Sequence, residues 1–120
     1  MSKFLIHLHT GPENPTKAAL GFLVAVAALR QGQQVDLFLA GDGASLIGDA
    51  ALSSVEGKGT GNLGTHFKEL VDGGARFYVS GMSAKARGLS EADLVDKPAE
   101  FAMPDVLVRL AAEADVVLTY

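Results

Sequence analysis

Residues 3–40 read KFLIHLHTGPENPTKAALGFLVAVAALRQGQQVDLFLA, and the succession of patterns in this stretch decides the fold class. The apolar run at 3–9 is typical of a strand, and the cluster of turn formers that follows it predicts a loop. Asn14 before Pro15 predicts a helix start, because an Asn side chain accepts from free amides and proline suits the first helical position.

The second half of this stretch completes the unit. Gly32 supplies the residue that commonly ends a helix, so we expect the helix to reach about Gln31. Residues 34–40 then form a second strand. Both strands are almost continuously apolar, which suits parallel strands in a sheet covered on both faces. The pattern is strand, helix, strand.

The rest of the chain repeats this alternation with variations. Residues 41–62 are rich in Gly and Ser and are expected to form one short helix followed by a mobile loop. Ser90 and Asp93 have capping-box spacing. The remaining expected elements are a helix at 63–72, a strand at 75–80, a short helix from Ser83, a helix at 90–95, a strand at 100–103, a helix at 104–114 and a strand at 115–120. The sequence therefore predicts a single α/β domain over 1–120, with three layers and about five mostly parallel strands.

Composition excludes several classes of protein. The chain has 120 residues, a formal net charge of −4 and no cysteine. The negative charge argues against a nucleic-acid-binding surface, and the absence of cysteine excludes disulfides, thiolate metal sites and cysteine nucleophiles. The longest apolar segment, 18–29, is too short to span a membrane, and no signal peptide is visible, so the expected location is cytoplasmic.

Two glycine-rich motifs lack the context that their chemistry needs. Residues 59–64 match G-x-G-x-x-G, but they do not follow the first buried strand, so we interpret them as a surface loop. Lys58 does not complete a phosphate-binding loop, because Ser53 stands where that motif requires glycine. No cofactor is expected.

The histidines give at most half of a metal site. His7 and His9 alternate along the first strand and therefore point to the same face. Only His66 or carboxylates of unknown position remain as further ligands, so we favour strand-end histidines that are hydrogen-bonded near a crevice, and we expect no metal.

Two segments leave the carboxyl ends of strands, where open α/β sheets bind their ligands. The first is the HTGPENP loop at 9–15, and the second is the junction VSGMSAKARGL at 79–89. Helix-start amides and two cations at the junction favour a small anion, although solvated surface charges explain the same two residues equally well. The candidate ligand-binding residues are His9, Thr10, Gly11, Asn14, Ser80, Gly81, Met82, Ser83, Lys85 and Arg87.

The chain resembles the DsrE/DsrF-like family of small sulfur-relay proteins, which includes the YchN-type proteins, over nearly its whole length. The resemblance is carried by residues 7–43, by LVDGGARFYVSGMSAKARGLSEADL at 70–94 and by AAEADVVLTY at 111–120. It implies a DsrE-like fold, a homo-oligomer such as a trimer or hexamer, and a persulfide-carrying cysteine before the K-A-R-G segment. Alignment on Lys85–Gly88 places that carrier position at Ser80 and a second family cysteine at Ser83.

The missing cysteine changes the expected function. A serine hydroxyl cannot carry a persulfide, and no G-x-S-x-G elbow identifies Ser80 as a nucleophile, so we expect no catalytic residue. Ser83 is expected to cap a helix and Ser80 to fit a tight strand exit. The favoured function is a non-catalytic oligomeric binding or assembly module for a small anion or partner protein. The alternative is an accessory subunit of a sulfur-relay complex whose cysteine comes from a partner.

The helix in 15–31 is the second reason to expect an oligomer. Its apolar residues lie on nearly every face, whereas a surface helix normally has one apolar stripe. A sheet covers only one side of such a helix, so we expect another subunit to cover the rest.

Overall fold

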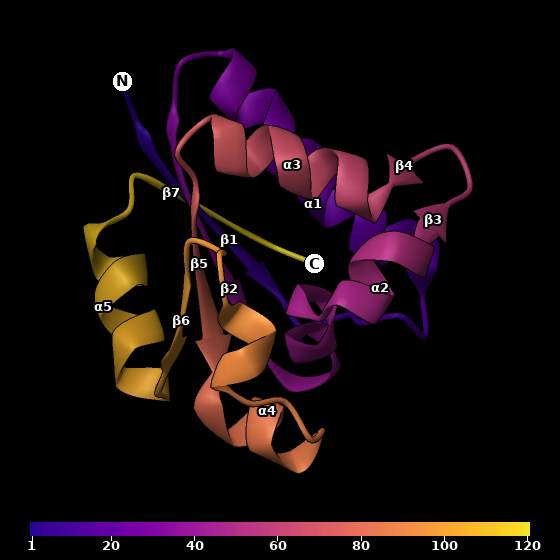
Figure 1. Ribbon diagram of the computed structural model, residues 1–120. Helices are drawn as coiled ribbons and strands as arrows, with labels where there is room; N and C mark the ends of the chain where they lie inside the picture. The colour runs from indigo at the N-terminus through magenta and orange to yellow at the C-terminus, as the bar shows by residue number, and fades with distance from the viewer.

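The computed structural model describes all 120 residues and has one five-stranded sheet in the order β6-β5-β2-β1-β7 (Figure 1). All four pairings in this sheet are parallel. The strands are β1 (Lys3–Leu8), β2 (Gln34–Leu39), β5 (Arg76–Ser80), β6 (Ala99–Ala102) and β7 (Val116–Thr119). The prediction of about five mostly parallel strands is confirmed, including the short strand before Pro104.

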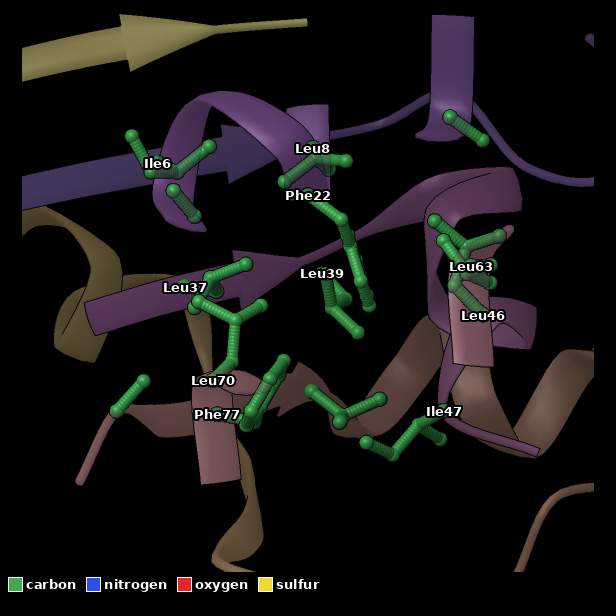
Figure 2. Packing of buried hydrophobic residues seen from close by; sticks show 14 of the residues in the cluster. Ile6, Leu8, Phe22, Leu37, Leu39, Leu46, Ile47, Leu63, Leu70 and Phe77 are labelled. Atoms are coloured by element: carbon green, nitrogen blue, oxygen red, sulfur yellow. The ribbon is translucent and has the colours of Figure 1, made fainter. Parts of the chain in front are cut away.

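Helices cover both faces of the sheet. Figure 1 shows α1 (Pro15–Arg30) and α3 (Leu63–Asp72) on one side and α5 (Pro104–Glu113) on the other. The larger core cluster joins side chains of α1 and α3 to the strands, for example Phe22 and Leu70 around Leu37 (Figure 2). A smaller cluster places Leu110 of α5 against the opposite face. The predicted three-layer architecture is therefore present.

Local sequence explains how α1 begins and how closely it approaches the sheet. The Asn14 side chain accepts a hydrogen bond from the Lys17 amide at 3.2 Å, as a helix cap does. Gly21 faces β1 so closely that a Cβ there would lie 2.5 Å from Leu8 Cδ2. Gly32 ends the segment with φ of 81°, a left-handed conformation that glycine adopts without strain. The predicted strand–helix–strand unit is confirmed.

The segment between β2 and α3 is more ordered than the sequence predicted. It contains a 3₁₀ helix, η1 (Gly41–Ile47), the short helix α2 (Asp49–Ser54), and a hairpin of β3 (Glu56–Gly57) and β4 (Gly61–Asn62). The G-x-G-x-x-G match begins in the tip of this hairpin, where Gly59 and Gly61 have positive φ. It is therefore a turn motif away from the main sheet, as expected, but the expected plain loop is wrong.

Other elements of the chain cover more of α1 than the sheet alone does. Helix α3 packs along α1, and the β3–β4 hairpin contacts it too, so the premise that only the sheet covers this helix is wrong. Apart from Met1, the exposed large apolar side chains lie elsewhere, on α5, on β7 and in the segments around α4, η2 and the start of α5: Met82, Val95, Met103, Val108 and Val117. Self-association of the chain stays a prediction. No helix is long and apolar enough to cross a bilayer.

The C-terminal third follows the predicted order. Helix α4 (Gly81–Ala86) follows β5, and a second 3₁₀ helix, η2 (Glu91–Leu94), carries the predicted capping box between Ser90 and Asp93. The Ser90 amide donates to Asp93 Oδ2 at 2.8 Å. This box fixes the segment that returns the chain to β6.

Candidate functional site

The strand order decides how the two predicted halves of the site meet. Because β2 lies between β1 and β5, the turn after β2 separates the loop after β1 from the junction after β5. Gly41 donates its amide to Ser83 Oγ at 2.8 Å on one side. On the other side Gly11 is so close to the turn that a Cβ there would lie 2.2 Å from the Asp42 carbonyl oxygen. The two halves therefore meet through residues 41–43.

Ser80 caps helix α4, and it does so from a buried position. Its hydroxyl accepts from the Ser83 amide at 3.3 Å, and the residue is 7% exposed. The prediction that Ser83 caps this helix is wrong, because the helix begins at Gly81 and Ser83 already lies inside its first turn. Ser83 instead uses its hydroxyl to hold the turn after β2. Both serines thus have structural partners.

The two cations of the junction differ in their partners. Arg87 Nη2 pairs with Asp42 Oδ1 at 2.7 Å, and Arg87 Nη1 donates to the Ser83 carbonyl at 3.1 Å. Lys85 is exposed and makes no ion pair or side-chain hydrogen bond. An external anion would therefore find one free ammonium, and it would compete with Asp42 for the guanidinium.

The predicted residues of the loop after β1 are mostly engaged in holding that loop. Thr10 is buried, and the Gly11 amide donates to both carboxylate oxygens of Glu13 at 2.9 and 3.0 Å. Asn14 caps α1 as described above. At the junction, by contrast, Met82 is 58% exposed, and the position a Cβ would take on Gly81 lies 3.8 Å from Met103 Sδ. Two exposed methionines therefore flank the start of α4.

His7 and His9 lie on one face, as predicted. Their ring centroids are 5.8 Å apart, and His7 also meets the Phe38 ring edge-on. Burial, and secondarily the positive charge of a protonated His9, lower the pKa of His7 below its ordinary value, which favours the neutral imidazole. His7 Nε2 is buried without a hydrogen-bond partner, so the expectation of two hydrogen-bonded histidines fails for this nitrogen.

No third metal ligand joins the two histidines. The chain contains no group of three or more His, Cys, Asp or Glu side chains placed to hold an ion. His66 lies at the β3–β4 hairpin, where its Nε2 is 2.8 Å from the Thr60 carbonyl. The pair of histidines remains an isolated feature of the β1 end.

A pocket of about 450 Å³ opens beside the junction, and it is the one pocket in the chain. It is lined by segments that follow three strands: Pro12 after β1, Ser45 and Gly48 after β2, and Leu89 and Asp93 after β5 and α4. None of the ten predicted ligand-binding residues lines it. The pocket lies at the edge of the sheet where the predicted segments leave their strands, and the ten predicted residues stay a prediction.

Lys97 holds two walls of this pocket together. Its Nζ donates to the Ile47 carbonyl at 2.9 Å and to the Asp93 carbonyl at 2.6 Å, and it pairs with Asp49 Oδ1 at 2.8 Å. The side chain is 10% exposed. No local pattern indicates this role, because a single lysine after a turn is usually solvated.

Comparison with known proteins agrees with the geometry. The family model described as the DsrE/DsrF-like family matches residues 2–120. An uncharacterized protein of Methanocaldococcus jannaschii is 33% identical over 85 residues, which are 71% of this chain and 31% of that protein, so the chain spans about a third of that relative.

Two solved structures share the fold. The ychN protein from E. coli superposes with a TM-score of 0.83 at 23% identity, covering 100% of both chains. A conserved protein of unknown function from Bacteroides thetaiotaomicron gives a TM-score of 0.72 at 12% identity, covering 99% of this chain and 95% of that one.

Proposed function

Because the chain belongs to the DsrE/DsrF-like family, we propose that it is a DsrE-like binding or assembly module, oligomeric and without catalysis of its own, which holds a small anion or a partner protein at the strand-end edge of its sheet. The observation that carries the proposal is Ser80. Where the resemblance implies the family's carrier cysteine, the chain has a buried hydroxyl that caps a helix.

The groups around Ser80 support a role without catalysis. A serine nucleophile needs a base within hydrogen-bond reach, and the one side-chain hydrogen bond of Ser80 is with the Ser83 amide. No thiol occurs in the 120 residues. A persulfide therefore has no thiol sulfur to form on.

The charged residues of the junction support a weak anion site, at which the Asp42 carboxylate competes with the anion for Arg87. Lys85 is free, but Asp42 already occupies one edge of the Arg87 guanidinium. Charge-assisted hydrogen bonds contribute about 1.5–3 kcal/mol in favourable settings, and exposure to water and salt reduces that contribution. An anion or an acidic group of a partner must displace Asp42 before it binds both cations.

We expect the substitution Asp42→Asn to strengthen anion binding at the junction, because it removes the competing carboxylate and leaves Arg87 free. Sulfate, sulfite, thiosulfate and phosphate are titrated against chloride at matched ionic strength, and the melting temperature is recorded. An anion at about 100 times its dissociation constant stabilises the fold by about 2.7 kcal/mol, a shift of several degrees.

The control for this titration is the double variant Lys85→Ala/Arg87→Ala, which removes both cations. If it responds to every anion as the wild type and Asp42→Asn do, the effect is general salt exclusion and the anion proposal is wrong.

We also expect no sulfur transfer. Incubation with a persulfide donor should add no 32-dalton increments to the intact mass.

Variants that introduce a thiol at the junction should differ in reactivity. Because Ser80 is buried and Met82 is 58% exposed, the Ser80→Cys variant should react with a thiol reagent at least about ten times more slowly than Met82→Cys. Equal rates would show that the strand exit is open and would remove this support.

The alternative is an accessory subunit whose cysteine comes from a partner chain. The exposed Met82 and Met103 favour it, because flexible thioether side chains adapt well to a binding partner. Co-purification with a cysteine-bearing relative, lost on Met82→Glu, would favour this alternative over a module that binds small anions.

A further inference from the structure

The pocket beside the junction differs from the junction in its chemistry. Its volume of about 450 Å³ lies within the range of small-molecule sites. Pro12, Ala50 and Leu89 give it apolar walls. Ser45 also lines it. The pocket therefore combines apolar walls with polar side chains.

The charges at the pocket are predominantly negative. Asp49 and Asp93 line it, and no lysine or arginine does. Lys97 lies behind the wall with all three ammonium protons directed to Ile47, Asp93 and Asp49. Two carboxylates and one ammonium leave a local charge of −1. An anionic ligand is thus disfavoured here, whereas a cation gains from the free oxygen of Asp49, whose side chain is 93% exposed.

We propose that this pocket binds a small amphipathic amine, with its apolar body against Pro12, Ala50 and Leu89 and its ammonium group at Asp49 and Asp93. The position fits the general rule that open α/β sheets bind ligands beyond the carboxyl ends of their strands. The proposal goes beyond the anion site at Lys85 and Arg87, because it uses different residues and the opposite charge.

Three aromatic probes of similar size distinguish the effect of ligand charge on binding from the effect of apolar contact: benzylamine, benzyl alcohol and benzoate. Each is titrated into the full chain, and backbone amide shifts are followed by NMR. Benzylamine should shift the amides of Ser45, Gly48, Ala50 and Leu89 with a dissociation constant on the order of 1 mM, as suits so small a ligand. Benzyl alcohol should bind several-fold more weakly, and benzoate should leave these amides unchanged.

Two variants with matched controls locate the site. Ala50→Trp fills the pocket mouth and should abolish the benzylamine shifts, while Ala112→Trp, at an exposed position on α5, should leave them intact. Asp49→Asn should weaken benzylamine by about three- to tenfold, and Asp105→Asn should not. Both pocket variants substitute exposed residues, so the dispersion of the amide spectrum confirms that they fold.

Several results would overturn the proposal. These are equal binding of benzoate and benzylamine at the pocket amides, benzylamine shifts that persist in Ala50→Trp, or no shift by any probe up to tens of millimolar. A failed anion titration at the junction bears on the proposed function and leaves this pocket unaffected, so the two failures are distinguishable.

Discussion

Replacing Lys97 with methionine should lower the free energy of unfolding by about 2–4 kcal/mol. Methionine keeps the length and the apolar stem of the side chain but removes the ammonium group that satisfies two carbonyls. The Ile47 and Asp93 carbonyl oxygens lie 2.9 and 2.6 Å from Nζ. Leaving a buried acceptor without a partner costs about 1–3 kcal/mol.

The ion pair with Asp49 contributes little to this effect. The Asp49 side chain is 93% exposed, and exposed pairs contribute at most about 1 kcal/mol. Asp49→Asn should therefore change stability far less than Lys97→Met. The matched control is Lys85→Met, an exposed lysine without partners, which should stay within about 0.5 kcal/mol of the wild type.

Urea denaturation measures these differences as shifts of the midpoint at constant slope. If Lys97→Met and Lys85→Met are equally stable, the Lys97 contacts do not persist in solution. The same result would also count against a well-formed pocket, because Lys97 joins the segment before α2 to the segment around η2. If the contacts of Lys97 do hold these two walls together, Lys97→Met should also weaken benzylamine binding.

Local patterns were sufficient to predict the elements. Asn14 and Pro15 located the start of α1, Ser90 and Asp93 located η2, and alternation of strands and helices predicted the layers. Each of these signals acts over a few residues, through a cap or through the burial of a strand. The predictions of about five mostly parallel strands and of a short strand before Pro104 were accordingly correct.

The arrangement of the site could not be read in the same way. The neighbours of β2 in the sheet follow from packing of the whole chain, and they decide that Gly41 and Asp42 separate the two predicted segments. The contact of Arg87 with Asp42 joins residues 45 positions apart, which no local pattern reveals. For the same reason the pocket, formed by three distant segments, was missed.

The prediction of which serine caps α4 was wrong by three residues. Ser83 was expected to cap α4, but Ser80 does so. Both residues are serines three positions apart, and either satisfies the rule for a helix start. The choice depends on a distant partner, because the Gly41 amide engages the Ser83 hydroxyl and leaves Ser80 to accept from the helix.

The largest loss of stability should come from Phe77→Ala, at about 3–5 kcal/mol. Phe77 is 1% exposed, and its ring centroid lies 5.9 Å from that of Phe22 and 5.0 Å from that of Phe67. It thus joins β5 to both α1 and α3, and Figure 2 shows it in the same cluster as Leu37 and Leu70. Truncation removes the contacts with both helices and leaves a cavity, which costs about this much in rigid cores.

Two further variants show whether the loss of stability depends on the central position of Phe77 and on the volume that the substitution removes. Phe101→Ala, at a half-buried position on β6, should cost less than half as much, because water and neighbours fill its space more easily. Phe77→Leu keeps most of the volume and should cost less than about 1.5 kcal/mol. A domain of this size is normally stable by about 5–15 kcal/mol, so Phe77→Ala removes a large part of its stability. For a chain of this length the loss corresponds to a fall in melting temperature of roughly 10–20 °C. Equal losses in Phe77→Ala and Phe101→Ala would contradict the placement of Phe77 at the centre of the core, and with it the packing of α1 and α3 against β5.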